Sequence, residues 1–280
     1  MNKYRIENTN NNIMRNYLLT CSLQSKKFLT IEKMMKNTLI LFFILLTNLS
    51  YGQKTEFKIY PVDESRKDST LYKFVEILKE VIMNKDTSKL YNMLDENIIS
   101  SFGGGIYGKQ GFIETWELEK PDSSLVWGLM KRIIDMGGVF EEGGVTESTQ
   151  DSMSFRFPYT TSTKLFEPIY KKNPDYDFDP YFTMICIKEN VPVYKRPNKK
   201  SSFVGKLSYD VLCINYNKKE HYKVDKTDGN REWFYVSTLD KSTKGWILYN
   251  VDEIYFLAEY SLIIEKIKGE YKITGFFPYD

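Results

Sequence analysis

The stretch that decides the fold is residues 190–211, NVPVYKRPNKKSSFVGKLSYDV, together with KGWI at residues 244–247. A polar, lysine-rich turn interrupts a series of short apolar runs, which lie at residues 191–194, 203–207, 211–216 and 233–236. Short apolar runs at close, even spacing, with turn residues between them, are typical of a small all-β barrel. We therefore expect an all-β domain at residues 181–252.

The order of these runs resembles the bacterial SH3-type domain over residues 183–251. This resemblance implies a small β-barrel that binds cell-wall components or peptides. The segment also holds more aromatic residues than so small a core needs, and aromatic side chains with polar tips suit peptide grooves. We take four of them as candidate ligand-binding residues: Tyr194, Tyr209, Trp233 and Tyr235. The alternative, that most of the tryptophans are barrel core, stays open.

The region before the barrel reads as helices followed by strands. Apolar residues at helical spacing predict a helix from residue 69 to about 84, with Asp68 or Ser69 as its cap. Further helices are expected after Asp86, over residues 110–118 and over residues 123–136. The run NKDT at residues 84–87, followed by LDENI at 94–98 and GK at 108–109, resembles nuclear-transport-factor-two-like domains.

That second resemblance covers residues 69–118 and returns at residues 256–277, where KGEYKIT marks a closing hairpin. It implies cone-like helices on a curved antiparallel sheet. We therefore expect an α+β domain at residues 53–159, completed by the hairpin at 255–280, with the SH3-type barrel inserted before that hairpin. Residues 160–180 show no apolar period and are expected to be a linker.

A secretory leader is expected near the start of the chain. Residues 34–52 have a positive start, a short apolar core and a small-residue exit, which define a signal peptide and are too short for a membrane span. We expect translation to begin at Met34 or Met35, so that residues 1–33 are a non-native N-terminal extension. The protein is then secreted or periplasmic, with no stable membrane span after cleavage.

Loss of the leader changes the charge balance. Of the 39 basic and 37 acidic residues, residues 1–52 hold seven and two, so the remainder carries a net charge of −3. A chain so near neutrality gives no electrostatic reason to expect nucleic acid as a partner. Cys186 and Cys213 remain, and we favour two buried thiols over a disulfide.

No complete catalytic, metal or cofactor motif is found. The glycine-rich run at residues 103–110 ends in Gln110 where a phosphate loop needs Ser or Thr, and alternating aspartates at 175–179 lack the remaining calcium-loop residues. His221 is the only histidine. The carboxylates near Trp116, and Glu141 with Glu142, are more typical of solvated helix faces than of sugar chemistry.

The sequence therefore predicts a non-catalytic, exported binding protein. Its SH3-type domain is expected to recognise a cell-envelope peptide, a peptidoglycan component or an envelope protein, without a cofactor or metal. The alternative is a small-molecule hydrolase or isomerase that uses a cavity in the α+β domain. Titratable side chains converging in such a cavity would favour the enzyme, and an apolar interior would favour the scaffold.

Overall fold

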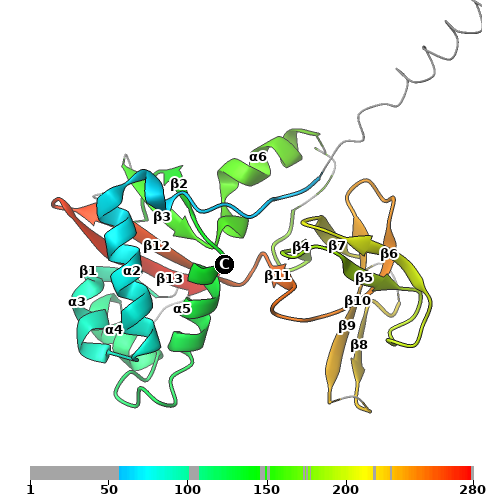
Figure 1. Ribbon diagram of the computed structural model, residues 1–280, viewed down its shortest axis with the longest axis horizontal. Helices are drawn as coiled ribbons and strands as arrows, with labels where there is room; N and C mark the ends of the chain where they lie inside the picture. Colours follow the sequence, from blue (N-terminus) through cyan, green and yellow to red (C-terminus); the bar gives the residue numbers. More distant parts are fainter. Residues whose placement is uncertain are drawn as a thin grey trace, which may run out of the picture. The chain divides into compact units, whose positions relative to one another are not determined.

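The structure, a computed structural model, describes residues 57–278 apart from residues 101–106, 146–148, 150–151, 173, 175, 177, 217–218 and 228. The described residues form one compact unit that contains both helices and sheets (Figure 1). The α+β class expected from the sequence is confirmed at this level. The expected signal peptide and the extension before it lie outside the described residues.

The first sheet has five strands in the order β1-β13-β12-β3-β2. Their bounds are Leu94–Ile99 for β1, Val139–Glu142 for β2, Met153–Phe157 for β3, Tyr260–Ile267 for β12 and Glu270–Pro278 for β13. The expected closing hairpin is present as β12 and β13. Lys268 and Gly269 at its turn have φ values of 50° and 92°, and positive values at both central residues are typical of a two-residue hairpin turn.

The expectation of a wholly antiparallel sheet is wrong at one edge. β1 pairs in parallel with β13, whereas the other pairings of this sheet are antiparallel. The two parallel strands are separated by most of the chain, so no tight hairpin forces them into opposite directions.

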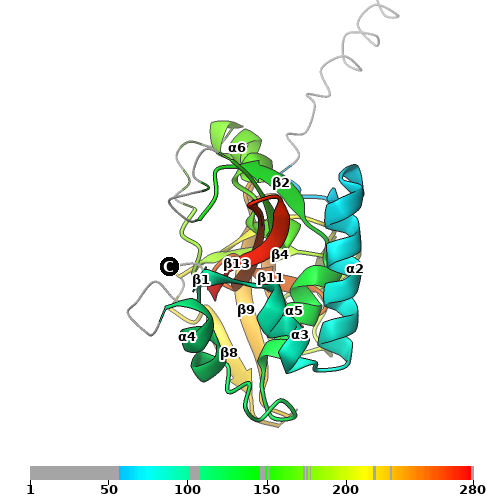
Figure 2. The same cartoon turned by 90° about the vertical axis from the view of Figure 1, so that its left-hand side faces the viewer.

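Helices pack on one face of this sheet and bury an apolar core. They are η1 (Ser65–Lys67), α2 (Ser69–Met83), α3 (Thr87–Met93), α4 (Gly108–Thr115) and α5 (Val126–Asp135). The carboxylate of Asp68 accepts hydrogen bonds from the backbone N–H groups of Thr70 and Leu71, so the expected cap of α2 is confirmed. α2 and α5 lie side by side (Figure 2). Within the described residues, no helix has the length and apolar character needed to cross a bilayer.

The second sheet has eight strands, in the order β11-β4-β7-β9-β10-β5-β6 with β8 paired to β9. Their bounds are Thr183–Cys186 for β4, Val191–Tyr194 for β5, Phe203–Leu207 for β6, Val211–Ile214 for β7, Tyr222–Asp225 for β8, Arg231–Thr238 for β9, Lys244–Leu248 for β10 and Ile254–Phe256 for β11. The short apolar runs of the sequence are thus strands. Among the described residues, no pairing joins β6 to β11, so the strand ladder is not closed.

Residues 160–180, expected from the sequence to be a linker with no apolar period, contain a helix with two buried apolar side chains. This helix is α6 (Thr163–Lys172), which follows the short helix η2 (Tyr159–Thr161). Phe166 and Ile169 are buried on one side of α6. Pro168 interrupts the helical spacing of apolar residues in the sequence and removes one helical hydrogen bond. Burial of the two apolar side chains offsets the cost of that lost hydrogen bond.

One apolar cluster joins the two sheets. It contains Val139 and Tyr159 from the region of the first sheet and Ile185 and Val211 from the second, with Phe166 of α6 packed among them. In addition, Tyr255 of β11 is fully buried in the core under the helices. The second sheet therefore shares buried surface with the first.

We expect the two sheets to unfold together, because the shared cluster is exposed if either sheet unfolds alone. The four tryptophans report on both halves, since Trp116 and Trp127 lie in the core of the first sheet and Trp233 and Trp246 in the second. In protein labelled with 5-fluorotryptophan, the four native ¹⁹F resonances should disappear at one urea concentration. Loss of the Trp233 and Trp246 signals before the other two would contradict this.

Candidate functional site

Three of the four residues expected to bind a ligand lie in one aromatic cluster. Tyr194 and Trp233 contact each other edge to face with ring centroids 5.4 Å apart, and Trp246 completes the buried group. Tyr235 packs on Trp246 from a half-buried position. Tyr194 and Trp233 are only 7% and 2% exposed. Their rings therefore support the sheet from inside and do not form a contact surface.

The fourth expected residue, Tyr209, lies apart from this cluster. It occupies the turn between β6 and β7 with a φ of 62°, and its ring is 5.4 Å from that of Tyr60. The backbone carbonyl of Tyr209 accepts a hydrogen bond from the N–H of Ile59. Tyr209 thus holds the segment that leads into η1 and α2, which is a structural role.

A row of partly exposed aromatic side chains lies on the other face of the second sheet. We call it the aromatic rim, and it consists of Tyr222, Phe234, Tyr249 and Phe256. Phe234 is the centre, with ring centroids 5.0 Å from Tyr222, 6.0 Å from Tyr249 and 5.3 Å from Phe256. Phe234, Tyr249 and Phe256 pack on the apolar core of this sheet and keep part of their surface in solvent.

The hydroxyl groups of the rim tyrosines are held by carboxylates. Tyr222 donates a hydrogen bond of 2.9 Å to Glu232, and Tyr249 donates one of 3.1 Å to Glu259. Burial, followed by the charge of Glu259, raises the pKa of Tyr249 to about 12. The ring faces remain the part of the rim that can contact a ligand. An aromatic row with fixed tips suits stacking on sugars or on apolar peptide side chains.

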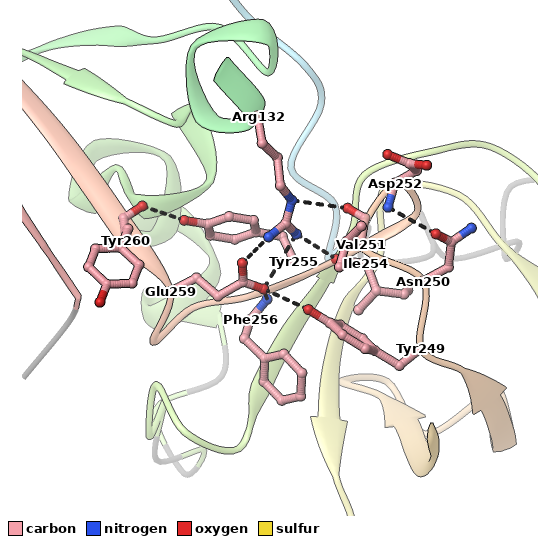
Figure 3. Close-up of polar contacts among 10 residues, drawn as sticks. All are labelled: Arg132, Tyr249, Asn250, Val251, Asp252, Ile254, Tyr255, Phe256, Glu259 and Tyr260. Atoms are coloured by element: carbon pink, nitrogen blue, oxygen red, sulfur yellow. Dashed lines mark hydrogen bonds and ion pairs between the residues drawn. The ribbon is translucent and has the colours of Figure 1, made fainter. Parts of the chain in front are cut away.

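An ion pair between α5 and the connection from β11 to β12 positions two rim residues (Figure 3). Glu259 pairs with Arg132, and it also accepts hydrogen bonds from the N–H of Phe256 and the hydroxyl of Tyr249. The guanidinium donates further bonds of 3.2 Å to the carbonyls of Val251 and Ile254. Burial lowers the pKa of Arg132, but the hydrogen bond and charge of Glu259 outweigh it and the net shift is upward.

The core of the first sheet, where the enzyme alternative placed its site, is apolar. Trp116 lies there at 8% exposure, packed against Phe112 and Phe276, while Glu114, Glu117 and Glu119 lie on the exposed side. The carboxylates beside Trp116 are therefore a solvated face. Glu142 is also exposed, but Glu141 is buried and pairs with Arg156 at 2.9 Å.

A second buried carboxylate was not foreseen from the sequence. Glu265 on β12 is 0% exposed and accepts hydrogen bonds of 2.6 Å from the N–H of Val145 and 2.8 Å from the hydroxyl of Thr149. A Cβ atom at Gly144 would lie only 2.5 Å from its Oε1, so glycine permits this approach. Glu265 therefore fastens the β2–β3 turn to the sheet. The signal in the sequence is a single acid within an apolar strand, SLIIEKI at residues 261–267.

The glycine-rich run, the alternating aspartates and His221 are the remaining candidates for a catalytic or metal site. Lys109 of the glycine-rich run pairs with Glu96 at 2.7 Å and lies over the ring of Tyr91. Residues 103–106 of that glycine-rich run and two of the alternating aspartates lie outside the described residues. Within the described part of the chain, no group of acidic, His and Cys side chains could hold a metal ion. His221 accepts a hydrogen bond from the N–H of Tyr235 through its backbone carbonyl.

Within the described residues, Cys186 and Cys213 are free thiols, so the sequence-based preference over a disulfide is confirmed for this pair. Cys186 is buried as expected, whereas Cys213 is only partly buried. Thr183 of β4 lies opposite Cys213 of β7, which places Cys186, three residues further along, on the opposite face of the sheet. Accordingly, Cys186 packs in the core beneath the rim and Cys213 in the cluster shared by the two sheets. Burial raises the pKa of each thiol to about 11.

Comparison with known proteins adds no relative: no family model, no curated protein and no solved structure matches the chain. The function is therefore argued from the residues and their geometry.

Replacement of Arg132 by Met should lower the free energy of unfolding by about 2 kcal/mol, between the values for exposed and fully buried pairs, because Glu259 loses its cation. Lys131 on the same helix is the matched control, since it pairs with Asp135 in solvent. Urea unfolding should show little effect of Lys131→Met, and Glu259→Gln should recover part of the loss in the double variant. Equal effects of the two single variants would contradict the assigned role.

Alkaline pH should destabilise the protein partly through Tyr249. A tyrosine in the unfolded chain has a pKa of about 10. Below that pH the neutral hydroxyl makes its full contribution to the free energy of unfolding. This contribution is lost as the pH rises toward the folded value of about 12. Tyr249→Phe removes the titrating group and should flatten this fall in the free energy of unfolding. Parallel pH curves for the two proteins, measured by urea unfolding, would exclude the effect.

Proposed function

We propose that the chain is an exported, non-catalytic binding protein whose β-rich segment recognises a cell-envelope peptide, a peptidoglycan component or an envelope protein. The observation that carries this proposal is the aromatic rim. Its four rings are partly exposed, and those of Phe234, Tyr249 and Phe256 pack on an apolar core. The hydroxyls of its two tyrosines are held by Glu232 and Glu259. A rigid aromatic row loses little conformational entropy on binding, which favours a recognition role.

We assign residues 183–251 to the bacterial SH3-type class as part of this proposal. Support comes from the number of short antiparallel strands in that segment and from their tight connections. Residues 69–118 with 256–277 are assigned to the nuclear-transport-factor-two-like class. The order of two helices, a strand and a further helix supports this second assignment, as does the return of the last hairpin to the first sheet.

The leader at residues 34–52 supports a secreted or periplasmic location. The apolar core between the helices and the first sheet supports a scaffold role for that part of the chain rather than the hydrolase or isomerase alternative. In this proposal the first sheet presents the second one, and the ligand is bound without chemical change.

Binding to isolated bacterial cell walls tests the proposed role. Residues 53–280 should sediment with the walls, and Tyr222→Ser or Phe256→Ser should each weaken binding about tenfold, as expected for aromatic contact residues. Tyr107→Ser is the matched control, because Tyr107 is 61% exposed and lies outside the rim. Circular dichroism should show that all three variants are folded.

Failure of the unmodified chain to sediment would remove the cell wall as ligand. Equal binding of the rim variants and the control would place the contact surface elsewhere.

A further inference from the structure

The hairpin formed by β5 and β6 carries a concentration of positive charge. Residues 195–206 contain five basic side chains and no acidic one, and all five are exposed: Lys195, Arg196, Lys199, Lys200 and Lys206. None of the five forms an ion pair within the described part of the chain. Other lysines do form such pairs, among them Lys79 of α2, Lys89 of α3 and Lys109 of α4. The positive charge of the hairpin is therefore available to a partner.

The turn that bears these charges is ordered by its own hydrogen bonds. The side chain of Asn198 accepts a bond of 2.8 Å from the N–H of Lys200, and the hydroxyl of Ser201 accepts one of 3.0 Å from the N–H of Arg196. The N–H of Lys195 donates to the carbonyl of Ser202 at 3.0 Å. The backbone at the base of the cations is thus fixed before any partner arrives.

Beside these cations lies an unpaired strand edge with apolar side chains. β6 is the last strand in the order of the second sheet, so one of its edges has no neighbouring strand among those described. Phe203 and Val204 on β6 are 67% and 49% exposed. The ring of Phe203 lies 5.1 Å from that of Tyr194, which belongs to the buried aromatic cluster and holds it in place.

Charge decides which partner fits this edge. Lysines along an edge strand normally discourage pairing with other strands. A second copy paired in parallel would place the same cations against one another, which is disfavoured. A second copy paired antiparallel would bring no carboxylate from its own hairpin, because residues 195–206 hold no acidic residue. An extended segment rich in Asp or Glu has the opposite charge, and it can also add main-chain hydrogen bonds to β6.

Insertion into a membrane fits less well, because the tip of the hairpin is polar and basic. Phe203 and Val204 lie along the strand, beyond the tip. A membrane-inserting loop would instead need its apolar residues at the tip.

We propose that β6 is a docking edge for an extended acidic segment of another protein, which adds to the second sheet as a further strand. Apolar side chains of that segment contact Phe203 and Val204, and its carboxylates pair with the cations of the hairpin. This edge and the aromatic rim lie on different strands, so the inference stands independently of the proposed function.

A synthetic peptide of about eight residues with alternating Glu and Val provides the probe. Its binding to residues 53–280 is measured by fluorescence anisotropy at low and at physiological salt. The double variant Lys199→Glu with Lys200→Glu should weaken binding at least about tenfold. The control Lys73→Glu with Lys120→Glu changes the net charge equally at exposed sites away from the hairpin and should bind as the unmodified chain does.

Two further arms separate strand addition from other modes of binding. A peptide with N-methylated backbone amides keeps the charge but cannot complete the main-chain pairing, so it should bind much more weakly. Phe256→Ser in the aromatic rim should leave peptide binding unchanged, which distinguishes this site from the proposed function.

The proposal is overturned if the peptide does not bind, if both charge variants bind equally, or if N-methylation has no effect. Hairpin-dependent binding to vesicles of phosphatidylglycerol and phosphatidylcholine in preference to the peptide would also overturn it, and would identify a membrane surface as the partner.

Discussion

The rest of the structure depends on the pairing of the last hairpin with the first sheet. β12 and β13 occupy the centre of the order β1-β13-β12-β3-β2, although they are the last strands in the sequence. Without them, β1 and the β2–β3 hairpin have no common neighbour, and the helices have no continuous surface to cover. The chain must therefore leave the first sheet, build the second, and return. The second sheet is therefore connected to the first at both its beginning and its end in the sequence. The Arg132–Glu259 ion pair stabilises the second connection, where β11 leads into β12. Such long-range closure is costly in chain entropy, so the buried apolar cluster shared by the two sheets is a necessary compensation.

Local patterns predicted most of the elements because each element has a local cause. Asp68 and Asp86 accept hydrogen bonds at the starts of α2 and α3, and Lys268-Gly269 supplies the conformation that a tight hairpin needs. Helix α6 was not predicted, because Pro168 and the charged residues around it obscure the helical spacing of Phe166 and Ile169. These two side chains are buried by residues of the second sheet that are distant in the sequence. The direction of β1 was also not predicted, because its partner strand β13 comes from the end of the chain and local sequence does not reveal the pairing.

The candidate site shows the same limit more sharply. The sequence identified a surplus of aromatic residues in the second sheet, and alternation along β9 separates Trp233 and Tyr235 from Phe234. Both faces of that strand carry aromatic rings, so alternation alone cannot say which face is covered. In the structure Tyr194, Trp233 and Trp246 bury one another, whereas Phe234 is left at the margin of the opposite core with Tyr249 and Phe256. Only the fold of the sheet reveals that the last two belong with Phe234, because Tyr249 directly follows β10 and Phe256 ends β11, both further along the chain.

The distribution of charge separates two kinds of surface on the second sheet. Near the rim, Glu259 is paired with Arg132, whereas Glu232 accepts a hydrogen bond from Tyr222 and keeps its negative charge. The exposed rings therefore lie beside carboxylates. At the β5–β6 hairpin the opposite holds, since four cations lie in the turn that leads into β6, Lys206 lies on β6 itself, and one edge of this strand has no neighbour among the described strands. In our proposals a neutral sugar or an apolar side chain gains binding free energy at the aromatic rim. It gains little at the β5–β6 hairpin, where contact would require the desolvation of a cation. An acidic strand is attracted by the cations of the β5–β6 hairpin, whereas at the rim it would be repelled by the carboxylate of Glu232. In our two proposals the surfaces bind ligands of different chemistry, and they pack on separate buried clusters.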